Sequence, residues 1–162
     1  MPGCELYVKI DEPFQGQVAE EWLRRVVEKT LIQEEINSTV ELGLVITDDE
    51  TIRQLNRSYR GKDETTDVLS FALMENRQGE AKTPFVSPPD GATHLGEVLL
   101  SYPRAAIQAR ERKHSLEQEL ALLVIHGVLH LLGYRDEDEA AEARMRAAEK
   151  RVLGEVIDEP LL

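Results

Sequence analysis

A strongly apolar segment, residues 120–132, constrains the fold of this chain more than any other feature. It is long enough for more than three helical turns, and apolar residues occupy nearly every side of such a helix. A helix that is apolar all round needs other elements to cover it. The segment therefore predicts a central helix, which Gly133 would end in the left-handed conformation that often follows a helix.

The rest of the chain supplies elements that can cover this helix. Alternating apolar residues or short apolar runs predict four strands: 6–10, 40–46, 67–73 and 95–101. Helical spacing predicts four more helices: 17–36, 49–59, 103–113 and 138–153. Residues 75–93 are rich in Gly, Pro, Asn and Asp and are expected to form a long exposed loop. This order predicts an α+β fold, a four-stranded mixed sheet packed against helices.

Two helix starts carry capping sequences. Thr47 or Asp48 could cap the helix that begins near residue 49, with Glu50 placed for a capping box from Thr47. Ser115 and Gln118 form a second capping-box pattern, just before the apolar segment.

Length and composition predict one cytoplasmic domain, residues 1–162. No apolar run reaches the roughly 18 residues of a membrane span, and residues 1–10 lack the pattern of a signal peptide. Cys4 is the only cysteine, which excludes an internal disulfide and a cysteine-rich zinc motif. These features favour a reducing compartment, with Cys4 as a small apolar side chain of the first strand.

The net charge of −12 argues against broad, non-specific nucleic-acid binding. Residues 51–114 nevertheless hold ten Lys and Arg against eight Asp and Glu, a net of +2. This excess is consistent with a basic functional face or with ordinary scatter of charge on solvated helices.

Two histidines within the apolar segment predict a metal site. His126 and His130 are four residues apart, so a helix places both imidazoles on one face. Burying both without a ligand would require two sets of hydrogen-bond partners. After the turn at Gly133, Asp136 can supply a third ligand. Three protein ligands with an open position are typical of a catalytic zinc site.

Alternatives remain for the third ligand and for the reaction. Residues 136–139 are all acidic and could simply form a helix N-terminus, and Asp138 is the rival ligand. The ligand spacing also occurs in zinc proteases with the His-Glu-x-x-His signature, whose glutamate is the general base. Here Gly127 stands at that position, so the pattern favours a different hydrolysis.

A dense polar segment, residues 55–71, marks a second candidate site. Arg60 and Lys62 could hold a phosphate, since a guanidinium binds a phosphodiester through two parallel hydrogen bonds. The alternative is structural, with Arg60 and Asp67 paired across the turn.

Together these segments resemble the YbeY family of bacterial endoribonucleases. The family pattern His-Gly-x-Leu-His-Leu-x-Gly-Tyr matches residues 126–134, and similar upstream patterns match residues 55–71 and 95–98. The resemblance implies a zinc-dependent, single-strand-selective endoribonuclease that matures the 3′ end of small-subunit rRNA and acts in ribosome quality control. The family's metal ligands fall on His126, His130 and the position of Asp136, and its active-site arginine falls on Arg60.

One departure concerns the metal. Residues 135 and 136 are Arg-Asp where the family has Asp-His. A carboxylate binds zinc at a similar distance, but it lowers the charge on the metal and favours Mn²⁺ or Mg²⁺ more than imidazole does. We therefore expect one zinc ion per chain, with manganese or magnesium as alternatives.

In this interpretation the metal activates water or polarises a phosphoryl oxygen, and Arg60 stabilises charge on the phosphate. Single-stranded RNA of the small ribosomal subunit would bind Lys62 and the basic stretch of Arg104, Arg110 and Lys113. That stretch could equally be a solvated helix end. Two other functions remain open: a non-catalytic, metal-stabilised ribosome-associated factor, and a metal hydrolase with a non-RNA substrate.

Overall fold

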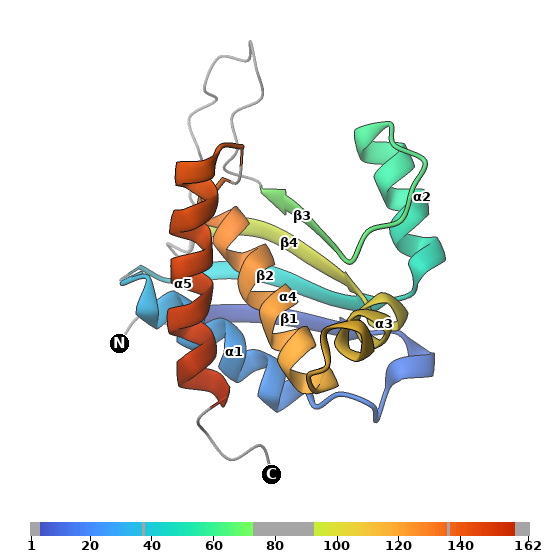
Figure 1. Ribbon diagram of the computed structural model, residues 1–162, viewed down its shortest axis with the longest axis horizontal. Coiled ribbons are helices and arrows are strands. Elements are labelled where there is room, and N and C mark those ends of the chain that lie inside the picture. The colour runs from blue at the N-terminus through green and yellow to red at the C-terminus, as the bar shows by residue number, and fades with distance from the viewer. Residues whose placement is uncertain (1–3, 37, 73–92, 136, 158–162) are drawn as a thin grey trace.

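The computed structural model describes residues 4–36, 38–72, 93–135 and 137–157 (Figure 1). Its strands are β1 (Cys4–Ile10), β2 (Val40–Thr47), β3 (Val68–Ala72) and β4 (Thr93–Ser101). Its α-helices are α1 (Glu20–Gln33), α2 (Asp49–Arg60), α3 (Tyr102–Arg112), α4 (Leu116–Leu131) and α5 (Glu139–Ile157), and a short 3₁₀ helix spans Glu12–Phe14. The order of strands and α-helices agrees with the predicted one.

The four strands form one mixed sheet in the order β1-β2-β4-β3. β1 pairs with β2 and β2 with β4 in parallel, whereas β3 pairs with β4 in antiparallel orientation. The predicted α+β fold with a four-stranded mixed sheet is confirmed. β3 lies at one edge of this sheet, which matters for the site described below.

The strands send alternate side chains to two faces of the sheet. On one face, Leu44 and Val98 belong to the main core, which also contains buried residues of α1, α3, α4 and α5. On the other face, Leu69 and Leu99 pack with Ile52 of α2 in a smaller cluster. Figure 1 shows the same division, with α1, α3, α4 and α5 over one face and α2 near the β3 edge. The apolar faces of the helices therefore pack against the apolar side chains of the strands on both faces of the sheet.

Helix α4 lies at the centre of the helical layer, as its composition predicted. Ten of its residues are buried, and it contacts α1, α3, α5, β3 and β4. The Ser115 side chain accepts a hydrogen bond from the backbone N–H of Gln118 at 3.1 Å, as the capping pattern predicted. Gly127 permits the close approach of α4 to the sheet, because an added Cβ would lie 2.5 Å from Cγ1 of Val98.

The chain leaves α4 through a Schellman motif centred on Gly133. The N–H of Tyr134 donates to the carbonyl of Leu129 at 3.0 Å, and the N–H of Gly133 donates to that of His130 at 3.0 Å. Gly133 has a φ of 106°, which disfavours any residue with a Cβ. The predicted helix end at Gly133 is confirmed.

The start of α2 decides between the two predicted caps. The carboxylate of Asp48 accepts a hydrogen bond from the N–H of Thr51 at 2.8 Å, so Asp48 is the N-cap. The capping box from Thr47 was wrong, because Thr47 still belongs to β2 and its hydroxyl donates to Asp11 at 2.5 Å. The hydrogen bond from Thr51 holds the pKa of Asp48 below its ordinary value.

Three further predictions concern the long loop, the single cysteine and membrane spans. The predicted loop at 75–93 falls almost entirely outside the described residues. Cys4 lies partly buried in β1, where burial and the nearby Glu28 raise the pKa of its thiol to about 11. Among the described helices, none is both long and apolar enough to cross a membrane.

Candidate active site

The side chains of His126 and His130 meet near the C-terminal end of α4. Their Nε2 atoms are 3.1 Å apart, and their rings lie nearly at right angles. The i, i+4 spacing on one helix face brings the rings together, as predicted. Two ring nitrogens therefore converge on one point while the helix around them is almost wholly buried.

A carboxylate from another helix orients the first of these rings. Nδ1 of His126 lies 2.6 Å from Oε2 of Glu149 on α5. An ionised carboxylate can only accept, so Nδ1 carries the hydrogen and the other ring nitrogen, Nε2, is the one that faces His130. Carboxylates that hold the outer nitrogen of a ligating histidine in this way are common around zinc.

The geometry of the pair fits a metal ion. Two nitrogens bound to one zinc ion at about 2.0–2.1 Å in tetrahedral geometry lie about 3.3 Å apart. The observed separation of 3.1 Å is close to this value and is also that of a hydrogen bond between the two rings. Among the residues that the structure describes, no third histidine, cysteine or carboxylate completes a metal-binding group. The predicted third ligand, Asp136, is outside the described residues.

The segment that leads to Asp136 is anchored on both sides. The Tyr134 hydroxyl donates to Oε1 of Glu34 at 2.6 Å, next to the end of α1. Burial, together with the adjacent Glu34 carboxylate, raises the pKa of Tyr134. After Asp136, Asp138 caps α5, since its carboxylate accepts from the N–H of Ala141 at 2.8 Å. Asp138, the rival ligand, is thus used at a helix N-terminus, as the structural interpretation of the acidic run expected.

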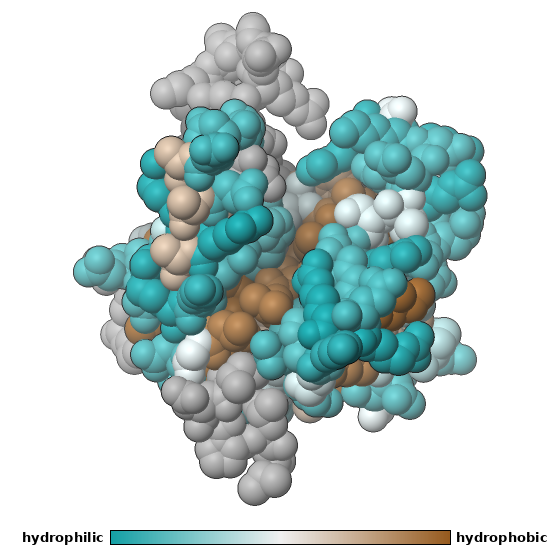
Figure 2. All heavy atoms as spheres, viewed as in Figure 1, coloured by the Kyte–Doolittle hydropathy of each residue, from teal (hydrophilic) through white to brown (hydrophobic). Residues whose placement is uncertain are grey.

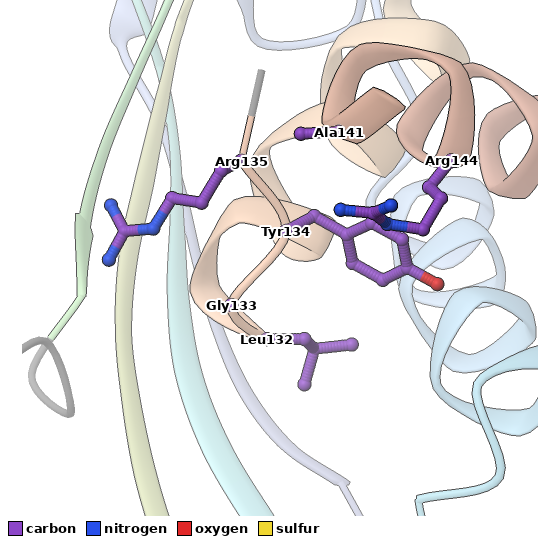
Figure 3. A pocket seen from close by; sticks show the side chains of 6 residues that line it. All are labelled: Leu132, Gly133, Tyr134, Arg135, Ala141 and Arg144. Carbon is purple, nitrogen blue, oxygen red and sulfur yellow. The ribbon is translucent and has the colours of Figure 1, made fainter. Parts of the chain in front are cut away.

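A pocket of about 360 Å³ opens where α4 ends and α5 begins (Figure 3). Its lining comprises Leu132, Gly133, Tyr134, Arg135, Ala141 and Arg144. Figure 3 shows that Arg135 extends toward the strands, whereas Arg144 lies beside the Tyr134 ring. This pocket adjoins the residues that precede Asp136, so the α4 exit is both anchored and accessible from solvent.

Arg60 reaches the same region from the other side of the edge strand. Its guanidinium donates to the carbonyl of Ser70 on β3 at 3.1 Å, and the Ser70 hydroxyl donates to the carbonyl of Gly127 at 3.3 Å. Gly127 directly follows His126, so two hydrogen bonds connect Arg60 to the backbone beside the histidine pair. Among the described contacts, Arg60 is not paired with Asp67, and the predicted structural pair is wrong.

The other predicted RNA-binding residues lie on two different parts of the surface. Lys62 is exposed just after α2, but Arg104 is partly buried and bonded to Asp49 at 3.2 Å. Arg110 and Lys113 are exposed near the end of α3. Lys113 precedes α4, and His126 lies ten residues into that helix, about 15 Å along its axis. The basic stretch on α3 is therefore separated from the histidine pair.

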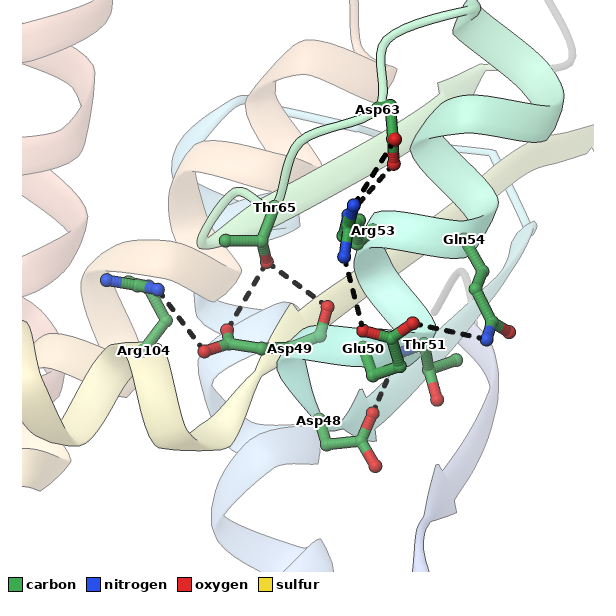
Figure 4. Close-up of polar contacts among 9 residues, drawn as sticks. All are labelled: Asp48, Asp49, Glu50, Thr51, Arg53, Gln54, Asp63, Thr65 and Arg104. Atoms are coloured by element: carbon green, nitrogen blue, oxygen red, sulfur yellow. Dashed lines mark hydrogen bonds and ion pairs between the residues drawn. The ribbon is translucent and has the colours of Figure 1, made fainter.

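Arg104 belongs to a polar network that fixes the turn between α2 and β3 (Figure 4). The Asp49 carboxylate also accepts hydrogen bonds from Ser101 at 2.5 Å and from Thr65 at 3.3 Å. Nearby, Arg53 binds Asp63 through two hydrogen bonds, of 2.8 and 3.2 Å, and this contact lowers the pKa of Asp63. The network holds the 61–67 turn against α2 and α3.

Sequence reasoning missed Glu149. It is one of 31 acidic residues in the chain, and it lies in a charged helix with no local pattern that marks it. Its contact with His126 spans 23 positions and depends on how α5 packs against α4. A sequence search for positions of α5 that face α4 could have reduced the number of candidate carboxylates, but it would not have identified Glu149.

Comparison with known proteins shows the family of this chain. The family model described as endoribonuclease YbeY matches residues 8–157. The chain is 47% identical over 145 residues to an endoribonuclease YbeY of Dehalococcoides mccartyi, which covers 88% of this chain and 91% of the relative. It is 44% identical over 147 residues to an endoribonuclease YbeY of Roseiflexus sp., covering 90% and 89% of the two chains.

A solved structure supports the fold as well. The solution structure of a Thermotoga maritima protein matches with a TM-score of 0.61 and 27% identity, covering 93% of this chain and 88% of the other. The match to this family places the protein among the hydrolases. The chain belongs to the endoribonuclease YbeY family, and the predicted resemblance is confirmed.

Proposed function

We propose that this protein is a metal-dependent endoribonuclease that cleaves single-stranded RNA, and that zinc is its native metal. The observation that carries the proposal is the 3.1 Å separation of the two Nε2 atoms, with Glu149 orienting one ring. Family membership supports the cleavage of RNA. We further propose that the substrate is the 3′ end of small-subunit rRNA in the cytoplasm, and that the protein acts in ribosome quality control.

His126, His130 and Asp136 would hold the metal. A zinc ion bound there would supply a Lewis acid that lowers the pKa of water and polarises a phosphoryl oxygen. Glu149 keeps the hydrogen on Nδ1 of His126 and so keeps Nε2 available as a ligand atom. The Asp136 carboxylate would reduce the net charge of the site and extend its tolerance to Mn²⁺ and Mg²⁺.

Arg60 would bind the scissile phosphate. Its guanidinium is exposed, and its contact with the Ser70 carbonyl holds it at the β3 edge, where the Ser70 hydroxyl in turn donates to the Gly127 carbonyl. A guanidinium offers several donors in a plane, so Arg60 can keep a bond to Ser70 and still donate to a phosphate. Charge developing on that phosphate would be stabilised by a donor already in position.

The path of the RNA follows from the exposed cations. Lys62 lies close to Arg60 in the chain, and both are exposed, so Lys62 would contact a neighbouring phosphate. Arg110 and Lys113 would bind RNA farther from the cut. The Asp49 contact makes Arg104 a structural residue with a lesser role in binding. Figure 2 shows an apolar strip between the hydrophilic surface of α5 and those of α2 and α3, so the exposed cations of α2 and α3 lie on the same side of it.

The test combines metal analysis with RNA cleavage. We would measure zinc and manganese in the purified wild type and in His126→Ala and Asp136→Ala, then assay cleavage of an unpaired RNA and its duplex. A transcript carrying the small-subunit rRNA 3′ end with its precursor extension tests the substrate. We expect about one metal ion per wild-type chain, loss of metal and cleavage in both variants, and inhibition by a chelator. Metal binding without cleavage of any RNA would favour a non-catalytic factor instead.

A further inference from the structure

The ring of Tyr59 is exposed to an unusual degree at the C-terminal end of α2. Its exposed fraction is 71%, and among the described residues only Tyr7 and Ile32 are other large apolar side chains classed as exposed. It lies in the last turn of the helix, directly before Arg60. The ring belongs neither to the hydrophobic core nor to the candidate metal site, so neither of these explains why an aromatic residue stands at this position.

The Tyr59 ring is nevertheless held in place. Its centroid lies 5.4 Å from that of Phe71, and the two rings are tilted by 59°. Phe71 packs in turn against the cluster of Ile52 and Leu69. The guanidinium of Arg60 lies 6.0 Å from the centre of the Phe71 ring. One side of Tyr59 is therefore supported by protein while most of the ring faces solvent, which makes a preorganised aromatic surface.

The charge around this ring favours a polyanion. Residues 51–62 contain four basic residues and no acidic one, although the chain carries a net charge of −12. Arg57, Arg60 and Lys62 of this segment are all exposed. Nucleic-acid surfaces that bind single strands combine cations for the backbone with aromatic rings for the bases. The C-terminal end of α2 has both.

The position of the ring relates it to the candidate active site. Tyr59 contacts Phe71, and the adjacent Ser70 contacts both Arg60 and Gly127. Figure 1 shows β3 lying between the end of α2 and the C-terminal end of α4. A strand of RNA whose phosphate is held by Arg60 can therefore place a neighbouring base at Tyr59.

From these observations we propose that Tyr59 is a stacking subsite for one unpaired nucleobase of RNA, next to the phosphate held by Arg60. The inference rests on the proposed function and adds a source of specificity to it. A base inside a duplex is already stacked on both faces, so only an unpaired base can stack on Tyr59. The subsite would thereby select single strands.

The experiment measures binding separately from cleavage. A fluorescein-labelled, phosphorothioate-linked single-stranded RNA resists hydrolysis, and its anisotropy reports the Kd of wild type, Tyr59→Leu and Tyr59→Phe. Tyr7→Leu is the matched control, because Tyr7 is an exposed tyrosine on β1, the opposite edge strand of the sheet. The same RNA is also prepared with one abasic nucleotide at each position in turn. Cleavage of ordinary RNA is assayed in parallel.

We expect Tyr59→Leu to raise the Kd roughly 5- to 100-fold, as for the loss of one stacked base, while Tyr59→Phe and Tyr7→Leu stay near wild type. Salt dependence should be unchanged in Tyr59→Leu, since no charge is removed. One abasic position should weaken binding to wild type but have no effect on Tyr59→Leu. Equal affinity of Tyr59→Leu and wild type for every RNA would overturn the subsite, even if cleavage persists. If Tyr59 contributes to RNA binding as expected but no RNA is cleaved, the proposed endoribonuclease function is overturned and the stacking subsite is not.

Discussion

The carboxylate of Glu149 lies 2.6 Å from Nδ1 of His126, so a residue of α5 sets the orientation of an imidazole carried by α4. The two residues are 23 positions apart. The contact holds the hydrogen of the His126 ring on Nδ1. The contact makes the packing of α5 on α4 part of the candidate metal site.

Glu149→Ala should therefore weaken zinc binding by about 10- to 100-fold, the usual cost of removing the partner of a ligating histidine. Glu149→Gln should lose less zinc affinity, because the amide oxygen of glutamine can still accept the hydrogen bond. The Kd for zinc, measured by competition with a fluorescent chelator, checks this. Glu142→Gln is the control, since Glu142 lies on the same helix and pairs only at the surface with Arg146. Equal zinc affinity of Glu149→Ala and wild type would show that Glu149 does not support the site.

Arg60→Ala should lower kcat/KM for single-stranded RNA by about 100-fold or more, the scale expected when a transition-state donor is lost. The kcat/KM of Arg60→Lys should lie between those of wild type and Arg60→Ala, because lysine keeps the charge but loses the planar set of donors. The stability of both variants should stay within about 0.5 kcal/mol of wild type, since Arg60 is exposed. Cleavage rates and urea unfolding provide the two measurements, with Arg146→Ala as a control. Wild-type cleavage by Arg60→Ala would remove Arg60 from the mechanism.

Gly127→Ala should reduce the free energy of unfolding by about 1–3 kcal/mol, because the new Cβ would overlap Val98. The double variant Gly127→Ala with Val98→Ala should lose less than the sum of the single variants, since the smaller residue relieves the overlap. Gly154→Ala is the control: nothing lies within 4 Å of its added Cβ, and alanine there should stabilise α5 by about 0.5–1 kcal/mol. Urea unfolding of the wild type, the two single variants, the double variant and the Gly154→Ala control decides whether close packing explains this glycine.

Asp48→Ala should cost about 1 kcal/mol of stability at neutral pH through loss of the α2 cap. The pKa of Asp48 is lowered in the folded state by the Thr51 N–H, so the capping contribution is complete above the unfolded pKa of about 3.9. It disappears as the pH falls through the folded pKa. The stability difference between wild type and Asp48→Ala, measured by urea unfolding at pH 7 and near pH 3, should therefore shrink in acid. Asp48→Asn should keep the cap and lack this pH dependence.

Several features of the site could be predicted because they depend on neighbours in the chain. The i, i+4 spacing alone brings His126 and His130 together once a helix forms. Gly133 ends that helix through backbone bonds within the same few residues. The cap at Ser115 is likewise local. At Thr47 and Asp48, however, the local patterns were nearly equivalent, and the hydrogen bond of Thr47 to the distant Asp11 decided between them.

The sequence by itself determined the order of the elements, the buried α4 and the histidine pair, because periodicity and turn residues act over a few positions. The tertiary structure decided which distant side chains meet. It assigned Glu149 to His126, Arg60 to the Ser70 carbonyl, and Arg104 to Asp49 instead of to the surface. These partners come from different elements, and many similar charged residues compete for each position. Only the packing of the helices on both faces of the sheet fixes which of them lie within hydrogen-bond distance.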